Sequence, residues 1–383
     1  MNVASGKTSS ETPRQLFATL KDDIVSVTND IKRRGVRRAM VGPLASLEAF
    51  YLTEEDRRRL AELHGFQRFL RRAWWLARGL LMKLTPARRI MLGVALVLLL
   101  FGRQELRFDT KRVSIGLPGL ASPLLLVVLM LELKDKLIAR DELEGGRAVQ
   151  LALMPGHRPE VPGWDVWLYT RPANDVGGDL VDHLRIDAGH HFVALGDVAG
   201  KALPAALLSV KLQATLRALA PSHEDLGDLG AAVNRILHRD GLPNRFASLV
   251  YMRLSSDSGR IRLLNAGHMP PYVIRNGSVS QIDRGSMVLG LVSETSFFEQ
   301  HIDLEEGDAL VAYSDGISEA MNEAGDFFGD ERLLALVGQT AALGVETIGS
   351  RILDAVAAFV GDAIPSDDVS LVVLKRRAPT GLF

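Results

Sequence analysis

Five aspartates lie where apolar, strand-like runs begin or end. Asp179 follows "VGG", Asp197 follows "FVALG", Asp315 follows "LVAYS", and Asp367 and Asp368 precede "VSLVVLK". One such Asp is usually a turn residue or a helix N-cap, so only the combination of several points to a shared site. If these strand ends converge, the carboxylates repel and raise each other's pKa. A divalent cation would remove that repulsion, and an all-oxygen set in a chain without cysteine favours Mg or Mn over Zn.

The chain from Trp164 onward has the pattern of an α+β domain. Short apolar runs such as "FVALG", "DALVAYS" and "VSLVVLKR" predict strands, and Asn276-Gly277 predicts a two-residue hairpin turn. Helical patterns occupy 204–219, 229–238, 331–339 and 345–359. Strands in meanders and helices in separate blocks predict antiparallel sheets covered by helices.

The front of the chain is basic and precedes its most apolar part. Residues 1–89 hold 18 Lys and Arg against 9 Asp and Glu, although the whole chain has a net charge of -1. We expect a disordered tail over 1–13 and a basic helical region over 14–89. The cluster "RFLRRAWWLARGLLMKL" is typical of a helix at a membrane interface. An anionic membrane surface is therefore the expected partner rather than nucleic acid, with a packed, solvated helical domain as the alternative.

Two uncharged stretches follow, over 90–102 and 113–131. The second is long enough to cross a hydrocarbon layer of about 30 Å, and the first is short alone. We expect one or two membrane spans within 90–131, with a helical hairpin leaving both chain ends on one side. One span with a buried helix, or a wholly soluble helical core, are the alternatives.

An amphipathic linker helix is predicted over 132–160, between these stretches and the α+β domain. Apolar residues recur there at three- and four-residue steps among charges. The helix could pair with its copy from a second chain, so a homodimer is a possible assembly. Pro155 ends the helical pattern.

The ordered combination of motifs resembles the metal-dependent protein phosphatases (PPM), in particular the bacterial branch named after the stage II E sporulation phosphatase (SpoIIE). "PANDVGGDLVD" and "LGDVAGKALPAALL" match its first two metal motifs, and "YSDGISEAMN" and "SDDVSLVVL" its last two. "DELEGGRAVQLALMP" is similar to its lead-in helix. The resemblance implies a β-sandwich flanked by helices over 161–378.

The resemblance also implies roles for individual residues. Asp179, Asp197, Asp315 and Asp367 would be ligands of two divalent cations, Mn or Mg, and Val198 would offer a backbone carbonyl. The first three would also be the catalytic aspartates. Asp368, His268 and Gly316 would support the ligands without touching a metal. The alternative role of His268 is that of a general acid for the leaving serine oxygen. Met269 and Lys201 depart from the family pattern, and Arg171 has no secure match to a phosphate-binding arginine.

The implied activity is hydrolysis of phosphoserine and phosphothreonine esters by a metal-activated water. The implied substrate is a phosphorylated protein such as an anti-sigma-factor antagonist in bacterial signalling. With the apolar stretches, this places the enzyme at the inner membrane with its catalytic domain facing the cytoplasm. The alternative function is a non-catalytic regulator that binds partners with a phosphatase-like fold.

Overall fold

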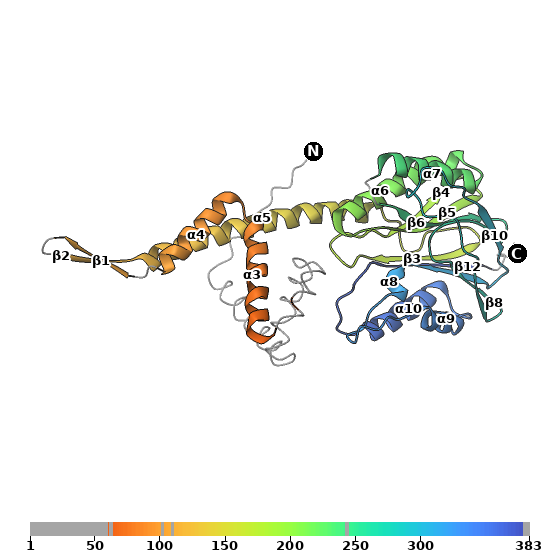
Figure 1. Cartoon of the computed structure of the whole chain (residues 1–383). Helices are drawn as coiled ribbons and strands as arrows, with labels where there is room; N and C mark the ends of the chain where they lie inside the picture. The colour runs from red at the N-terminus through yellow and green to blue at the C-terminus, as the bar shows by residue number, and fades with distance from the viewer. Residues whose placement is uncertain (1–59, 61–63, 101–102, 109–110, 242–244, 378–383) are drawn as a thin grey trace, which may run out of the picture. The chain divides into compact units, whose positions relative to one another are not determined.

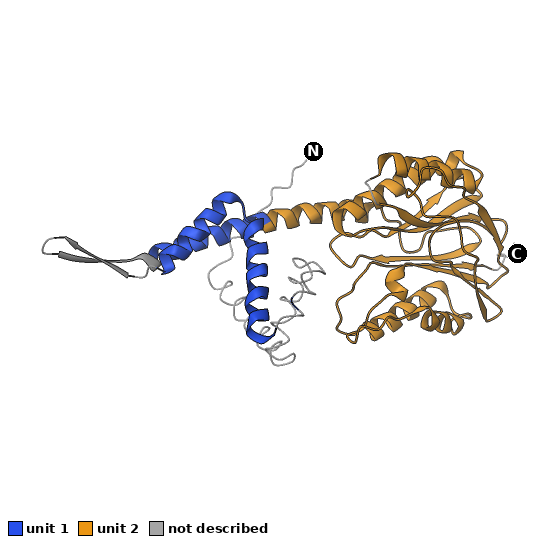
Figure 2. Ribbon diagram, in the orientation of Figure 1, with its two compact units in different colours: residues 1–135 blue, residues 136–383 orange. Residues whose placement is uncertain are grey.

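A computed structural model describes residues 60, 64–100, 103–108, 111–241 and 245–377. The chain divides into two compact units, 1–135 and 136–383 (Figure 2). The predictions of a disordered tail over 1–13 and of helices over most of 14–59 lie outside the described residues.

The first unit contains helices and one β-hairpin. Helix α3 (Gly65–Lys83) is followed by α4 (Pro86–Leu100), the hairpin β1 (Arg103–Phe108) and β2 (Lys111–Gly116), and the beginning of α5 (Leu117–Leu153). Arg88 of α4 forms ion pairs of 2.7 Å with Glu132 and with Asp135 of α5. These contacts tie α4 to α5.

The expected membrane spans over 90–131 are not found. Among the described residues, no helix combines the length and the apolar character needed to cross a membrane. Helix α4 has 15 residues, and the second apolar stretch is divided because 113–116 belong to β2. Helix α5 begins at Leu117, directly after the hairpin. Pro118 fits this start because a proline in the first helical turn loses no N–H that the helix would use.

The second unit is a sandwich of two antiparallel sheets flanked by helices (Figure 1). This confirms the predicted α+β class. One sheet has the order β10-β7-β6-β5-β4 and the other β3-β12-β11-β8-β9. The strands are β3 (Trp164–Arg171), β4 (Leu180–Arg185), β5 (His190–Val198), β6 (Ala247–Ser255), β7 (Arg260–Ala266), β8 (Tyr272–Arg275), β9 (Ser278–Gln281), β10 (Glu299–Asp303), β11 (Ala309–Tyr313) and β12 (Val369–Arg376).

Three apolar layers hold the sandwich together. The middle layer joins the sheets and includes Leu195, Leu263 and Val372. An outer layer packs α6 (Ala202–Leu219) and α7 (Leu226–Asp240) on the first sheet. The other packs α9 (Asp330–Gly338) and α10 (Val345–Val360) on the second sheet. Burial on both faces explains why the central strands read as nearly continuous apolar runs.

The predicted hairpin at Asn276-Gly277 is confirmed. Arg275 pairs with Ser278 across a two-residue turn, and the turn residues have φ of 48° and 79°. Positive φ at both positions is what a type I′ turn requires. Strands β4 and β10 were not predicted, because "LVDHLR" and "EQHID" mix charged residues into short edge strands.

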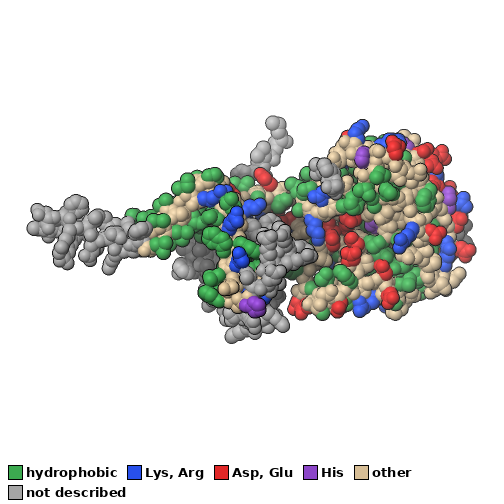
Figure 3. All heavy atoms as spheres, viewed as in Figure 1, with side chains coloured by type: hydrophobic (Ala, Val, Ile, Leu, Met, Phe, Trp, Pro, Cys, Tyr) green, Lys and Arg blue, Asp and Glu red, His purple; other side chains and the backbone are tan. Residues whose placement is uncertain are grey.

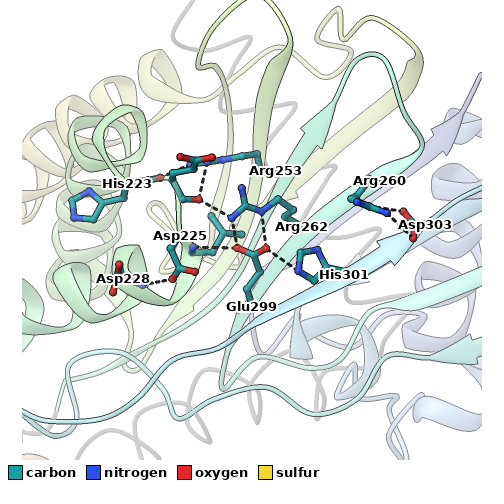
Figure 4. A network of polar contacts seen from close by, with 11 residues as sticks. His223, Asp225, Asp228, Arg253, Arg260, Arg262, Glu299, His301 and Asp303 are labelled. Carbon is teal, nitrogen blue, oxygen red and sulfur yellow. Dashed lines mark hydrogen bonds and ion pairs between the residues drawn. The ribbon is translucent and has the colours of Figure 1, made fainter.

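A polar network fastens the start of α7 to the first sheet (Figure 4). Arg262 donates to both carboxylate oxygens of Glu299, at 2.6 and 2.7 Å, and Glu299 accepts from the backbone N–H of Leu226 at 3.2 Å. Asp225 caps α7 by accepting from the N–H of Asp228. Buried Arg253 donates to the carbonyls of Ala220, His223 and Glu224. The network thereby satisfies backbone groups that the α6–α7 connection leaves unpaired.

Gly349 lets α10 lie against β3, and this contact can be tested. A Cβ built there would lie 2.0 Å from Trp167 Cζ3. We expect Gly349→Ala to lower the free energy of unfolding by about 1–3 kcal/mol through overpacking, measured by denaturant titration. Gly338→Ala is the control, because its Cβ would meet only Val279 at 3.6 Å. Equal stabilities of the two variants would contradict this packing.

Candidate active site

The predicted aspartates gather where strands of both sheets end. Asp197 lies near the end of β5, and Asp179 directly precedes β4 beside it. Asp315 begins the short helix α8 (Asp315–Ser318) after β11, and Asp367 precedes β12. A Cβ built on Gly178 would lie 3.1 Å from the Val198 carbonyl oxygen and 3.6 Å from Asp197 Oδ1. The loop before β4 therefore rests directly on the end of β5.

The carboxylates are near enough to affect one another's ionisation. Burial, followed by repulsion from Asp315, Asp367 and Asp368, raises the pKa of Asp197 to about 7. Burial and repulsion from Asp367 raise the pKa of Asp315 to about 6. Burial is also the main reason that the pKa of Asp179 lies well above its ordinary value. The protein thus holds several acidic groups where their charges are unfavourable.

The residue types at this acidic cluster fit a divalent cation. Asp179 is buried and its Oδ2 accepts no hydrogen bond, which is a costly state for a carboxylate oxygen. Among the described residues, no three His, Cys, Asp or Glu side chains are grouped tightly enough to hold one metal ion. The aspartates are therefore neighbours without converging on a point. Their oxygen-only chemistry suits Mg or Mn.

Asp368 supports the cluster by holding the loop before β4. Its Oδ2 accepts from the N–H of Gly178 at 2.6 Å, and its Oδ1 accepts from the N–H of Ala173 at 2.7 Å. A Cβ on Gly177 would lie 2.5 Å from the same Oδ2, so only glycine permits this approach. Gly316 has an equivalent function, since its Cβ would lie 1.9 Å from the Asp368 carbonyl oxygen.

His268 connects the two sheets beside the acidic cluster. Its Nε2 lies 3.1 Å from the Tyr313 carbonyl at the end of β11 and must donate to it, so the Nδ1 accepts from the Ser248 hydroxyl of β6 at 2.7 Å. Ser248 pairs in register with Asp197. Both ring nitrogens are engaged and burial lowers the pKa of His268 to about 4. These contacts favour a loop-fixing role over a general acid, which must carry a proton at working pH.

Three further residues of the site were not predicted as members. Glu319 raises the pKa of Asp315 by its charge; its position four residues later on a helical turn was the available signal. Lys201 forms an ion pair with Asp367, with its Nζ 3.8 Å from the Asp367 Oδ2. Arg171 lines a cavity of about 290 Å³ together with Gly316 and Asp367.

Replacing Asp179 by Asn should make the protein more stable than the wild type without metal and less stable than the wild type with metal. We expect metal-free Asp179→Asn to be more stable than the wild type by about 1 kcal/mol, because a buried acidic group that is repelled by Asp197 and Asp368 is removed. With Mn²⁺ the wild type should gain stability and the variant should gain much less. Thermal unfolding at both conditions measures this, with the exposed Asp257→Asn as control. A destabilised metal-free variant that still responds to Mn²⁺ would contradict the assignment.

The protonation of His268 can be read from the pH dependence of stability. Because the folded-state pKa is about 4 and the ordinary value is 6.5, the folded state resists protonation. Stability should be lost as pH falls through this window, with a slope of about 1.4 kcal/mol per pH unit. Denaturant titrations from pH 7 to 4 should show this slope as the difference between the wild type and His268→Gln. Identical pH dependences would mean that folded His268 titrates normally, as a general acid requires.

The family model of stage II sporulation protein E (SpoIIE) matches residues 187–377. Phosphoserine phosphatase RsbU of Bacillus subtilis is 26% identical over 242 residues, which cover 62% of this chain and 71% of RsbU. Protein IcfG of Synechocystis is 23% identical over 278 residues, covering 64% of this chain but only 43% of IcfG.

Solved structures agree with this match. The RsbU and RsbW domains of a Mycobacterium tuberculosis protein superpose with a TM-score of 0.52 at 27% identity, over 58% of this chain and 62% of that one. The SiaA-PP2C domain of Pseudomonas aeruginosa gives a TM-score of 0.55 over 63% of this chain and 98% of the domain; its 16% identity supports the fold alone. With the sandwich and its acidic strand ends, these matches place the C-terminal domain of this chain in the SpoIIE-type family of PPM serine phosphatases.

Proposed function

We propose that the chain is a metal-dependent phosphoserine and phosphothreonine protein phosphatase. The observation that carries the proposal is the gathering of Asp179, Asp197, Asp315 and Asp367 from separate strand ends, with an unpartnered buried oxygen on Asp179. Their carboxylates and the Val198 carbonyl would hold two divalent cations, Mn or Mg. Bound cations would supply an activated water and offset charge on the phosphoryl oxygens.

The remaining residues would position these groups and the substrate. Asp368 fixes the backbone before Asp179, and His268 fixes the strand ends that carry Asp197 and Asp315. The cavity beside Asp367 is lined by Arg171 and by apolar residues of α10. It could receive the phosphoryl group and the flanking side chains of a phosphorylated protein. An anti-sigma-factor antagonist is the proposed substrate class, supported by the similarity to RsbU.

The activity can be tested with the full chain. Wild-type protein with Mn²⁺ should hydrolyse p-nitrophenyl phosphate, and Asp197→Asn and Asp315→Asn should each lower kcat by about 100-fold or more, since each removes a proposed ligand. Arg275→Ala serves as a control for surface charge. Unchanged hydrolysis rates in both aspartate variants would contradict the metal mechanism. A wild type that binds Mn²⁺ and phosphoprotein without turnover would favour the non-catalytic regulator instead.

We also propose that α3 lies on an anionic membrane surface. The helix carries Arg68, Arg71, Arg72, Arg78 and Lys83 and no acidic residue. Phe66, Phe69 and Trp74 lie on its other side and are 73%, 64% and 67% exposed. Hydrophobic and basic side chains are visible together on this unit in Figure 3. One apolar and one cationic face are the properties of a helix that lies in the headgroup plane. The proposed location of the protein at the inner membrane, with the catalytic domain facing the cytoplasm, depends on this contact.

Vesicle binding tests the role of α3. Full-length protein should sediment with vesicles containing phosphatidylglycerol and only weakly with phosphatidylcholine, and added salt should reduce binding. The triple variant Phe66→Ser, Phe69→Ser, Trp74→Ser should bind at least about tenfold less, because its apolar anchor is gone. Phe327→Ser, an exposed site in the other unit, is the control. Equal binding of all proteins to both vesicles would refute the contact.

The homodimer through 132–160 stays a prediction. Analytical ultracentrifugation of the full chain without vesicles decides it.

A further inference from the structure

The last turns of α5 contact the loop that carries Asp179. Gln150 is 6% exposed, and its side-chain amide bonds to the backbone of Gly177 in both directions. The Nε2 donates to the Gly177 carbonyl at 2.8 Å, and the Oε1 accepts from the Gly177 N–H at 3.2 Å. A primary amide offers a donor and an acceptor on one carbon, and this spacing matches the carbonyl and the N–H of a single residue.

The same loop is held from its other side by a carboxylate. Asp368 accepts from the N–H groups of Gly178 and Asp179, at 2.6 and 3.3 Å. Residues 177–179 are thus fixed between Gln150 and Asp368. Asp179 follows Gly177 by two residues, so this backbone sets the direction in which its side chain leaves the loop. Its carboxylate also interacts with the Ser370 and Ser314 side chains, but Oδ2 has no hydrogen-bond partner.

The end of α5 is itself anchored independently of that loop. The Leu153 carbonyl accepts from Gln213 at 2.9 Å and from Arg217 at 3.2 Å, both on α6. Arg217 in turn pairs with the fully buried Asp182 of β4, at 2.6 and 2.9 Å. The helix that bears Gln150 therefore cannot drift without breaking contacts on both sides of Asp179.

We propose that Gln150 is a positioning residue for the metal site: its amide fixes Gly177 and thereby sets the affinity of the Asp179 carboxylate for a divalent cation. The inference rests on the proposed function. The end of α5 would then belong to the metal site and would not merely connect the two units, although Gln150 lies 29 residues before Asp179. Replacing a residue that orients a metal ligand without binding the metal commonly lowers metal affinity by about 10–100-fold.

The test compares two buried glutamines of similar surroundings in the full-length protein. Gln150→Met removes the contacts to Gly177. Gln213→Met removes a buried hydrogen bond to Leu153 but leaves the Leu153 carbonyl held by Arg217 and does not touch residues 177–179. We expect calorimetric titration with Mn²⁺ alone to show affinity lowered about tenfold or more in Gln150→Met and within twofold of wild type in Gln213→Met. Saturating Mn²⁺ should restore most of the kcat of Gln150→Met.

A second readout does not depend on metal or turnover. Amide hydrogen exchange of Gly177 in metal-free protein should accelerate in Gln150→Met, which removes the acceptor of the Gly177 N–H, but not in Gln213→Met. Unchanged exchange in Gln150→Met would overturn the proposal, as would equal loss of Mn²⁺ affinity in Gln150→Met and Gln213→Met. A wild type that neither binds Mn²⁺ nor hydrolyses phosphate would refute the proposed function and, with it, the metal role of Gln150.

Discussion

Mutual repulsion among buried carboxylates is the constraint around which the catalytic domain is organised. Asp179, Asp197 and Asp315 all have pKa values raised by burial and by neighbouring acids. A chain left to minimise its free energy without a cation would separate such groups or expose them. Keeping them together requires a stiff frame, and the stabilising contacts that surround the cluster provide it.

The frame combines large apolar layers with a few polar contacts at one edge. The layer between the sheets fixes β5 and β12, so Asp197 and Asp367 have little freedom. His268 joins β6 to β11 across that layer, and Asp368 joins the loop before β4 to the start of β12. Glycine at 177 and 316 removes side chains that would keep these backbones apart. Burial supplies the stability, and the polar contacts supply the geometry.

Much of the domain could be predicted because its signals are local. Continuous apolar runs identified the central strands, and Asn276-Gly277 identified a hairpin by its backbone requirement alone. The order of four Asp motifs identified the family. Strand β10 was missed because "EQHID" owes its pairing to β7 rather than to its own composition. The division of residues 113–131 between β2 and α5 was missed for a similar reason, since hydropathy reports apolar content but not where a strand gives way to a helix.

The supporting residues were harder to predict than the aspartates. Asp368 was expected to support the ligands because it adjoins Asp367, yet its contacts with Gly178 and Ala173 join segments nearly 200 residues apart. Gln150 gave no signal, because a glutamine in an amphipathic helix is most often a solvated residue. Only the folded chain brings such side chains to the loops that they hold.

Anomalous scattering at the manganese edge, from crystals of the protein soaked in Mn²⁺, would show whether the acidic cluster binds metal. We expect two peaks bounded by the carboxylates of Asp179, Asp197, Asp315 and Asp367, with the Val198 carbonyl oxygen at one of them. Absence of anomalous density between these side chains, or manganese bound only elsewhere on the chain, would contradict this expectation.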